Sequence, residues 1–155
     1  MSIAILYSGR YGTTKGVADR VAGAVDGDVP VTQIRRGIEC PDADTIVIGA
    51  AIYGGKASGA VTGFVESHRD ALMGRRVLLY VACLYDGERA EQQLADSFPP
   101  WLIAHSSGRY YVGGQVVWSR LSFFHKLLMK RVAGIEGNVE RLRSTEIDRM
   151  IADLR

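Results

Sequence analysis

Cysteine and long apolar runs are both scarce in this chain, which contains 2 cysteines among 155 residues. Cys40 and Cys83 have neither the spacing of a metal site nor that of a disulfide framework. We therefore interpret them as small residues at the edge of a sheet rather than as a redox pair. No apolar run approaches the ~18 residues that a membrane-spanning helix needs, and the N-terminus MSIAILYSGR lacks the features of a secretory signal. We expect a cytoplasmic globular protein without a bound metal.

Acidic residues are missing from one stretch near the C-terminus. The formal net charge of the chain is +2. Residues 118–133, called the basic segment below, contain four cations and no acid, so the rest of the chain carries a net charge of −2. Because the basicity is concentrated in one helix-length stretch, we expect no nucleic-acid-binding surface.

Short apolar runs alternate with helical patterns along the chain. We predict helices at about 17–25, 59–72, 88–97 and 101–105, and strands at 3–7, 31–35, 45–50, 77–83 and 109–117. Alternation at this spacing predicts an α/β fold in which helices cover both faces of a parallel sheet. Five strands fit the flavodoxin-like three-layer sandwich with strand order 2-1-3-4-5, and residues 1–155 read as a single domain.

The loop after the first predicted strand has the composition of an anion site. Ser8, Thr13 and Thr14 offer hydroxyl groups, and Gly9 and Gly12 allow the backbone to curl closely around a ligand. The helix that follows adds the positive end of its dipole. These features favour a phosphate, although a strand-to-helix turn without a ligand remains an alternative.

Other phosphate-binding or phosphate-accepting loops do not match this stretch. A Walker A loop requires Ser or Thr directly after its lysine, but Lys15 is followed by Gly16. The G-x-G-x-x-G fingerprint of dinucleotide-binding loops is absent from the first loop. A phosphoacceptor domain would have acids after its first strand, but none occurs between Ser8 and Asp19.

Two further loops at the same expected edge each contain an aromatic residue. Tyr53 lies in the glycine-rich turn AIYGGK (51–56), and Tyr85 lies in the turn LYDG (84–87). Each tyrosine alone could be an ordinary surface aromatic. Together with the phosphate loop, two aromatic walls with flexible backbone between them favour flavin mononucleotide (FMN).

The segments SGRYGTTKGVA (8–18), VIGAAIYGGK (47–56) and GGQVVWSRLSFFHKLLMK (113–130) resemble the flavodoxin superfamily, in particular its branch of menaquinone-dependent protoporphyrinogen oxidases. This resemblance implies an FMN site on three loops. The residues that would hold the phosphate are Ser8, Arg10, Gly12, Thr13 and Thr14. Those that would flank or close over the isoalloxazine are Ile52, Tyr53, Gly54, Gly55, Leu84, Tyr85 and Asp86. Gly9, Tyr11 and Ala51 complete the candidate site.

The basic segment has two different faces on a helical wheel. One face carries Trp118, Leu121, His125, Leu128, Met129 and Val132, and we expect it to pack in the core, with His125 as a packed residue rather than a catalyst. The other face carries Arg120, Phe123, Lys126, Leu127, Lys130 and Arg131. Cations interleaved with apolar groups suit an anionic membrane surface or an acidic partner, while a homodimer contact and a bent, fully buried segment remain alternatives.

The resemblance implies an oxidoreductase that passes electrons from a porphyrinogen substrate through FMN to a quinone, and so a role in porphyrin biosynthesis. We assign no catalytic acid or base, and Arg10, Tyr53 and Tyr85 are candidates for orienting flavin or substrate. A non-catalytic flavodoxin-type carrier is the main alternative, although carriers dock through acidic surfaces. A nicotinamide-dependent reductase and a partner-binding module without cofactor also remain open, the latter because Gly9 and Arg10 replace the hydroxyl residues of ordinary flavodoxins.

Overall fold

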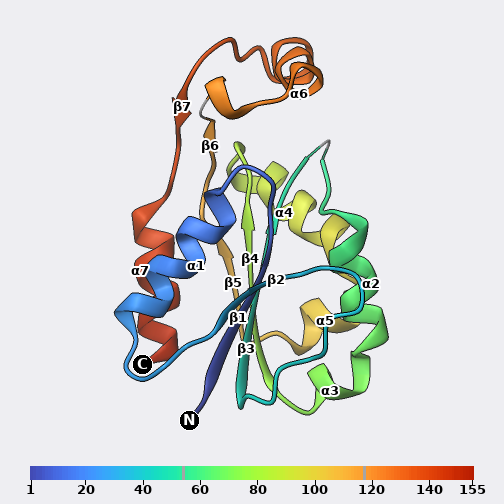
Figure 1. Cartoon of the computed structure of the whole chain (residues 1–155), viewed down its shortest axis with the longest axis vertical. Helices are drawn as coiled ribbons and strands as arrows, with labels where there is room; N and C mark the ends of the chain where they lie inside the picture. The colour runs from blue at the N-terminus through green and yellow to red at the C-terminus, as the bar shows by residue number, and fades with distance from the viewer. Residues whose placement is uncertain (54, 117) are drawn as a thin grey trace.

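A five-stranded parallel sheet forms the centre of the molecule (Figure 1). The computed structural model describes residues 1–53, 55–116 and 118–155. The strands lie in the order β2-β1-β3-β4-β5, which confirms the predicted flavodoxin-like order. They are β1 (Ile3–Ser8), β2 (Val31–Gln33), β3 (Thr45–Ala51), β4 (Arg76–Ala82) and β5 (Gly108–Tyr111). Because all of their pairings are parallel, their carboxyl ends meet at one edge of the sheet.

Two layers of helices cover the two faces of the sheet (Figure 1). One layer consists of α1 (Thr13–Ala24) and α7 (Ser144–Leu154). The other consists of α2 (Gly59–Ser67), α3 (Arg69–Met73), α4 (Gly87–Ser97) and α5 (Pro100–His105). The result is the predicted α/β three-layer arrangement.

Alternate residues of β1 belong to different hydrophobic cores. Ile3 and Ile5 pack with the residues of α1 and α7, whereas Ala4 and Leu6 pack with those of α2 to α5. Successive side chains of a strand point to opposite faces, and both faces are covered here. Every residue of β1 and β3 is therefore buried, which explains why both strands are apolar apart from Ser8 and Thr45 at their ends.

The predicted strand 109–117 is wrong in its second half, because β5 already ends at Tyr111. Gly113 has a φ of 77°, and a Cβ at this position would collide with the carbonyl group of Arg141. The chain therefore turns here and enters a separate antiparallel ribbon, in which β6 (Gln115–Val116) pairs with β7 (Val139–Glu140). Val117, at the end of the predicted strand, lies outside the described residues.

The predicted helix 59–72 is also divided. It is interrupted at His68, which separates α2 from α3. His68 still donates its backbone N–H to the carbonyl of Phe64 at 3.1 Å, but its φ of −117° and ψ of 27° leave the helical region, and α2 ends there.

The basic segment is helical, as predicted, but it is not one continuous helix. It consists of a 3₁₀ turn (η1, Trp118–Arg120), α6 (Phe123–Leu128) and a π-helical turn (η2, Met129–Ala133). Leu121 and Ser122 separate the first two parts, and the Ser122 hydroxyl accepts a hydrogen bond from the backbone N–H of His125 at 3.3 Å. β6 and β7 connect this segment to the body of the molecule, and α6 lies beyond the carboxyl edge of the sheet (Figure 1).

Candidate ligand-binding site at the carboxyl edge of the sheet

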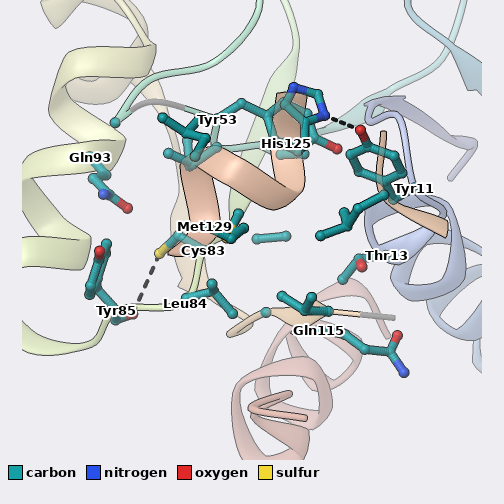
Figure 2. Close-up of a pocket in the computed structure, with 18 of the residues that line it drawn as sticks. Tyr11, Thr13, Tyr53, Cys83, Leu84, Tyr85, Gln93, Gln115, His125 and Met129 are labelled. Carbon is teal, nitrogen blue, oxygen red and sulfur yellow. Dashed lines mark hydrogen bonds between the residues drawn. The ribbon is translucent and has the colours of Figure 1, made fainter. Parts of the chain in front are cut away.

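A cavity of about 420 Å³ lies between the loops at the carboxyl edge and the basic segment (Figure 2). Its walls come from the loops after β1, β3 and β4, from β6 and from α6. Of the candidate site residues, those that line it are Tyr11, Thr13, Ala51, Ile52, Tyr53, Gly55, Leu84 and Tyr85. Three loops that are distant in the sequence therefore share one site, as the topology predicted.

The remaining candidate residues do not line the cavity wall. They are Ser8, Gly9, Arg10, Gly12, Thr14 and Asp86, and Gly54 lies outside the described residues. The first five lie between the last residue of β1 and the second residue of α1, a stretch whose Tyr11 and Thr13 do reach the cavity. The Arg10 side chain is exposed, with its guanidinium carbon 5.8 Å from the centre of the Tyr11 ring.

The β1–α1 loop has the geometry of an anion site. Gly12 adopts the left-handed conformation, with a φ of 91°, immediately before α1 begins. Within the described part of the chain no side chain caps α1, and its first turn contains no acidic residue. The first backbone N–H groups of the helix therefore remain available, and the helix dipole adds positive potential there.

Thr14 holds this loop together from inside. It is completely buried, and its hydroxyl donates to the carbonyl of Ser8 at 3.0 Å. The backbone at Gly9 lies so close to Thr14 that a Cβ on residue 9 would collide with the Thr14 hydroxyl oxygen. The sequence predicts that Thr14 helps to hold a phosphate, and in this structure its hydroxyl donates within the loop.

A buried tyrosine of the sheet holds the start of α1 in place through a hydrogen bond. The hydroxyl of Tyr80, on β4, donates to the carbonyl of Thr14 at 2.7 Å. A side chain at Gly49, on the adjacent β3, would collide with the Tyr80 ring, so glycine makes room for it. Complete burial raises the pKa of Tyr80, and the phenol therefore stays protonated and donates.

Three aromatic rings join the basic segment to the two loops beneath it (Figure 2). His125 stacks on Tyr53 with ring centroids 5.6 Å apart and an interplanar angle of 10°. Its Nδ1 forms a hydrogen bond with the Tyr11 hydroxyl, and Tyr53 accepts a hydrogen bond from the backbone N–H of Arg10 at 2.9 Å. We name the three residues Tyr11, Tyr53 and His125 the aromatic latch.

The latch corrects the prediction that His125 packs in the core. His125 is only partly buried and lines the cavity. Desolvation and the nearby Arg10 charge lower the pKa of His125, which favours the neutral form of the imidazole. Burial raises the pKa of Tyr53, so this ring is a neutral phenol as well.

The opposite wall combines an aromatic ring with a buried amide. The guanidinium carbon of Arg89 lies 3.7 Å from the centroid of the Tyr85 ring. The Cys83 thiol donates to the carbonyl of Tyr85 at 3.5 Å, and burial raises the pKa of that thiol. Gln93 also lines the cavity, and its buried Oε1 has no hydrogen-bond partner among the described residues. A ligand with an N–H group at its edge would satisfy this oxygen.

Sequence reasoning missed several cavity residues. Besides His125, the wall includes Ala82, Cys83, Arg89, Gln93, Gly114, Gln115, Val116, Leu121, Leu128 and Met129. Gln93 does carry a signal, because it shares the buried stripe of α4 with Ala90, Leu94 and Ser97. A long polar side chain on the buried face of a helix indicates either a hydrogen-bond network inside the protein or a contact with a ligand.

Solved structures share this architecture at low sequence identity. Fusobacterium nucleatum flavodoxin bound to flavin mononucleotide aligns with a TM-score of 0.55 and 13% identity, over 99% of this chain and 96% of its own. The WrbA-like flavodoxin of Agrobacterium tumefaciens aligns with a TM-score of 0.53 and 15% identity, over 87% and 96% of the two chains. At these identities the likeness establishes the fold.

A larger protein contains the same architecture as one part. Rubredoxin oxygen:oxidoreductase of Desulfovibrio gigas aligns with a TM-score of 0.56 and 14% identity over 98% of this chain. This chain spans only 36% of the length of that oxidoreductase.

The family model described as a flavodoxin domain matches residues 4–141 of this chain. No curated protein matches the sequence. The matched region includes the sheet, the three loops of the cavity and the whole basic segment. The chain belongs to the flavodoxin-domain family.

Proposed function

We propose that this protein binds FMN in the cavity and acts as an FMN-dependent oxidoreductase of the type that the menaquinone-dependent protoporphyrinogen oxidases represent. The FMN phosphate would lie at the start of α1, where the conformation of Gly12 leaves backbone N–H groups available. The isoalloxazine would lie in the cavity between the loops that contain Tyr53 and Tyr85.

Two observations on this structure support the fit of FMN. The cavity is lined mainly by apolar and aromatic side chains, as a flat tricyclic ring requires. The Oε1 of Gln93, which has no hydrogen-bond partner among the described residues, would accept a hydrogen bond from an N–H group on the edge of that ring. A bound flavin supplies the redox chemistry by accepting and releasing electrons.

In this proposal the protein's own residues bind, orient and shield the FMN. Thr14 and Tyr80 keep the start of α1 in position for an anion. Tyr53 and Leu84 form walls of the ring site, and His125 covers it from the basic segment. No side chain is required to act as an acid or base.

The observation that favours an enzyme over a carrier is the cover that the basic segment forms. His125, Leu128 and Met129 all line the cavity from this segment. A cover of this kind shields a bound substrate from water and restricts access to it. A simple carrier passes single electrons through an exposed edge of its cofactor and has no need of a cover.

The proposal is tested with FMN-loaded protein under anaerobic conditions. We expect oxidation of protoporphyrinogen that depends on both bound FMN and added menaquinone. The Gly9→Ala variant is the matched negative control, because its phosphate loop is distorted while the substrate side of the cavity is unchanged. A protein that holds FMN but leaves protoporphyrinogen unoxidised, while passing electrons to a redox protein, would instead be a flavodoxin-type carrier.

A further inference from the structure

The outward face of the basic segment exposes an unusual concentration of large apolar side chains. Among the described residues, five large hydrophobic side chains are exposed, and three of them lie on α6. Phe123, Phe124 and Leu127 are 83%, 67% and 37% exposed. Burying such groups against an apolar phase is favourable, so this face is unusual for a surface that meets only water.

The same segment carries four cations and, within residues 118–133, no acid. The four are Arg120, Lys126, Lys130 and Arg131. The nearest acid in the sequence on the C-terminal side is Glu136, whose carboxylate lies 3.4 Å from the Lys130 ammonium. That pair is well exposed on both sides and so contributes little. The Lys126 ammonium lies 5.8 Å from the centre of the Trp118 ring, which places a partly exposed indole at the border of the patch.

We propose that this face binds the surface of an anionic lipid bilayer. Phenylalanine and leucine side chains would enter the boundary between head groups and acyl chains, and the cations would contact anionic head groups. The indole of Trp118 suits the same boundary. No helix in the described part of the chain has the length and apolar character to cross a membrane, so α6 would lie flat in the interface. The proposal concerns a surface and does not depend on the redox function.

Charge disfavours a second copy of this chain as the occupant. A twofold contact places the same patch on both sides, and the four cations of each copy would then face each other. An anionic bilayer offers the opposite charge together with an apolar phase.

This orientation would place the cavity next to the bilayer. The same short helix points Phe123 and Leu127 outward and contributes His125 and Leu128 to the cavity wall. Because α6 lies beyond the carboxyl edge of the sheet (Figure 1), docking would bring that edge to the membrane. An apolar substrate dissolved in the bilayer would then have a short path to the cavity.

The test is co-sedimentation of the full chain with phosphatidylglycerol–phosphatidylcholine vesicles and with pure phosphatidylcholine vesicles. We expect binding to the anionic vesicles only, weakened at high salt. Phe123→Ser should reduce the partition coefficient roughly tenfold, because it removes one aromatic side chain that would be buried in the bilayer. Lys126→Glu should reduce it about 30-fold, because it reverses one charge near the surface.

Matched controls come from the opposite end of the molecule. Arg69 and Met73 lie on exposed positions of α3, far from α6 (Figure 1). Arg69→Glu and Met73→Ser should therefore leave vesicle binding unchanged. Equal losses in these controls, binding that ignores lipid charge, or no binding at all would overturn the proposal. So would a concentration-dependent dimer that Phe123→Ser abolishes, or a water-soluble acidic protein that occupies the patch while vesicles do not.

Discussion

Replacing Gly9 with alanine adds one methyl group at the point where the phosphate loop is tightest. The new Cβ would collide with the hydroxyl oxygen of Thr14, a fully buried side chain that cannot move into solvent. Thr14 would have to rotate and break its 3.0 Å hydrogen bond to the Ser8 carbonyl. The lost bond costs about 0.5–1.5 kcal/mol, and the overpacking adds about 1–3 kcal/mol.

The free energy of unfolding should therefore fall by about 2–4 kcal/mol, which lowers the melting temperature of a domain of this size by about 4–16 °C. The position of the first N–H groups of α1 would change as well. Loss of one charge-assisted hydrogen bond to a phosphate weakens FMN binding by about 10- to 100-fold. Thermal unfolding and fluorescence titration with FMN measure the two effects separately.

Gly23→Ala is the matched control. Gly23 lies on the same helix, and a Cβ there meets no atom within 4 Å. Alanine should increase helix stability by about 0.5–1 kcal/mol and leave FMN affinity unchanged. The clash itself is tested in a Thr14→Ala background, where the colliding oxygen is gone and Gly9→Ala should cost much less. An equal cost in both backgrounds, or a Gly9→Ala protein as stable as Gly23→Ala, would refute this explanation of the loop.

Three further predictions concern the walls of the site. Tyr80→Phe removes the 2.7 Å hydrogen bond to the Thr14 carbonyl and should lower the free energy of unfolding by about 1 kcal/mol; a melting temperature equal to that of the wild type would contradict it. Gln93→Leu should raise the melting temperature of the FMN-free protein, since it removes an unpaired buried oxygen, yet weaken FMN binding about fivefold; a change of the same sign in both would refute a ligand contact. Because the pKa of His125 lies below its ordinary value of 6.5, its contribution to stability is present above that pH and is lost as the pH falls below it. In the wild type, Tyr11, Tyr53 and Arg10 lie next to the imidazole. The melting temperature should therefore fall less between about pH 7.5 and pH 5.5 in His125→Gln than in the wild type.

The sheet and its three loops could be predicted because their signals are local. Unbroken apolar runs at 3–7, 45–50 and 77–83 indicated strands covered on both faces, and parallel pairing then placed their loops at one edge. The helix α7 carries an equally local signal, with Ile147, Met150, Ile151 and Leu154 at helical spacing, but no helix was predicted there from these residues.

The failures have a long-range origin. The strand after Tyr111 ends because Gly113 meets Arg141, a contact that the pattern of residues 109–117 does not contain. His125 lies on the inner face that the helical wheel identified, but that face packs over a cavity rather than over the sheet. The difference depends on the ribbon of β6 and β7, which joins distant residues. Local periodicity shows which face is inward and cannot show what lies beneath it.

The most direct test of the proposed site is an equilibrium titration of FMN into the flavin-free protein. We predict one FMN bound per chain, with affinity reduced in both Gly9→Ala and Gln93→Leu and unchanged in Gly23→Ala. A wild-type protein that fails to bind FMN, or binding that all three variants retain unchanged, would contradict the assignment of this cavity as a flavin site.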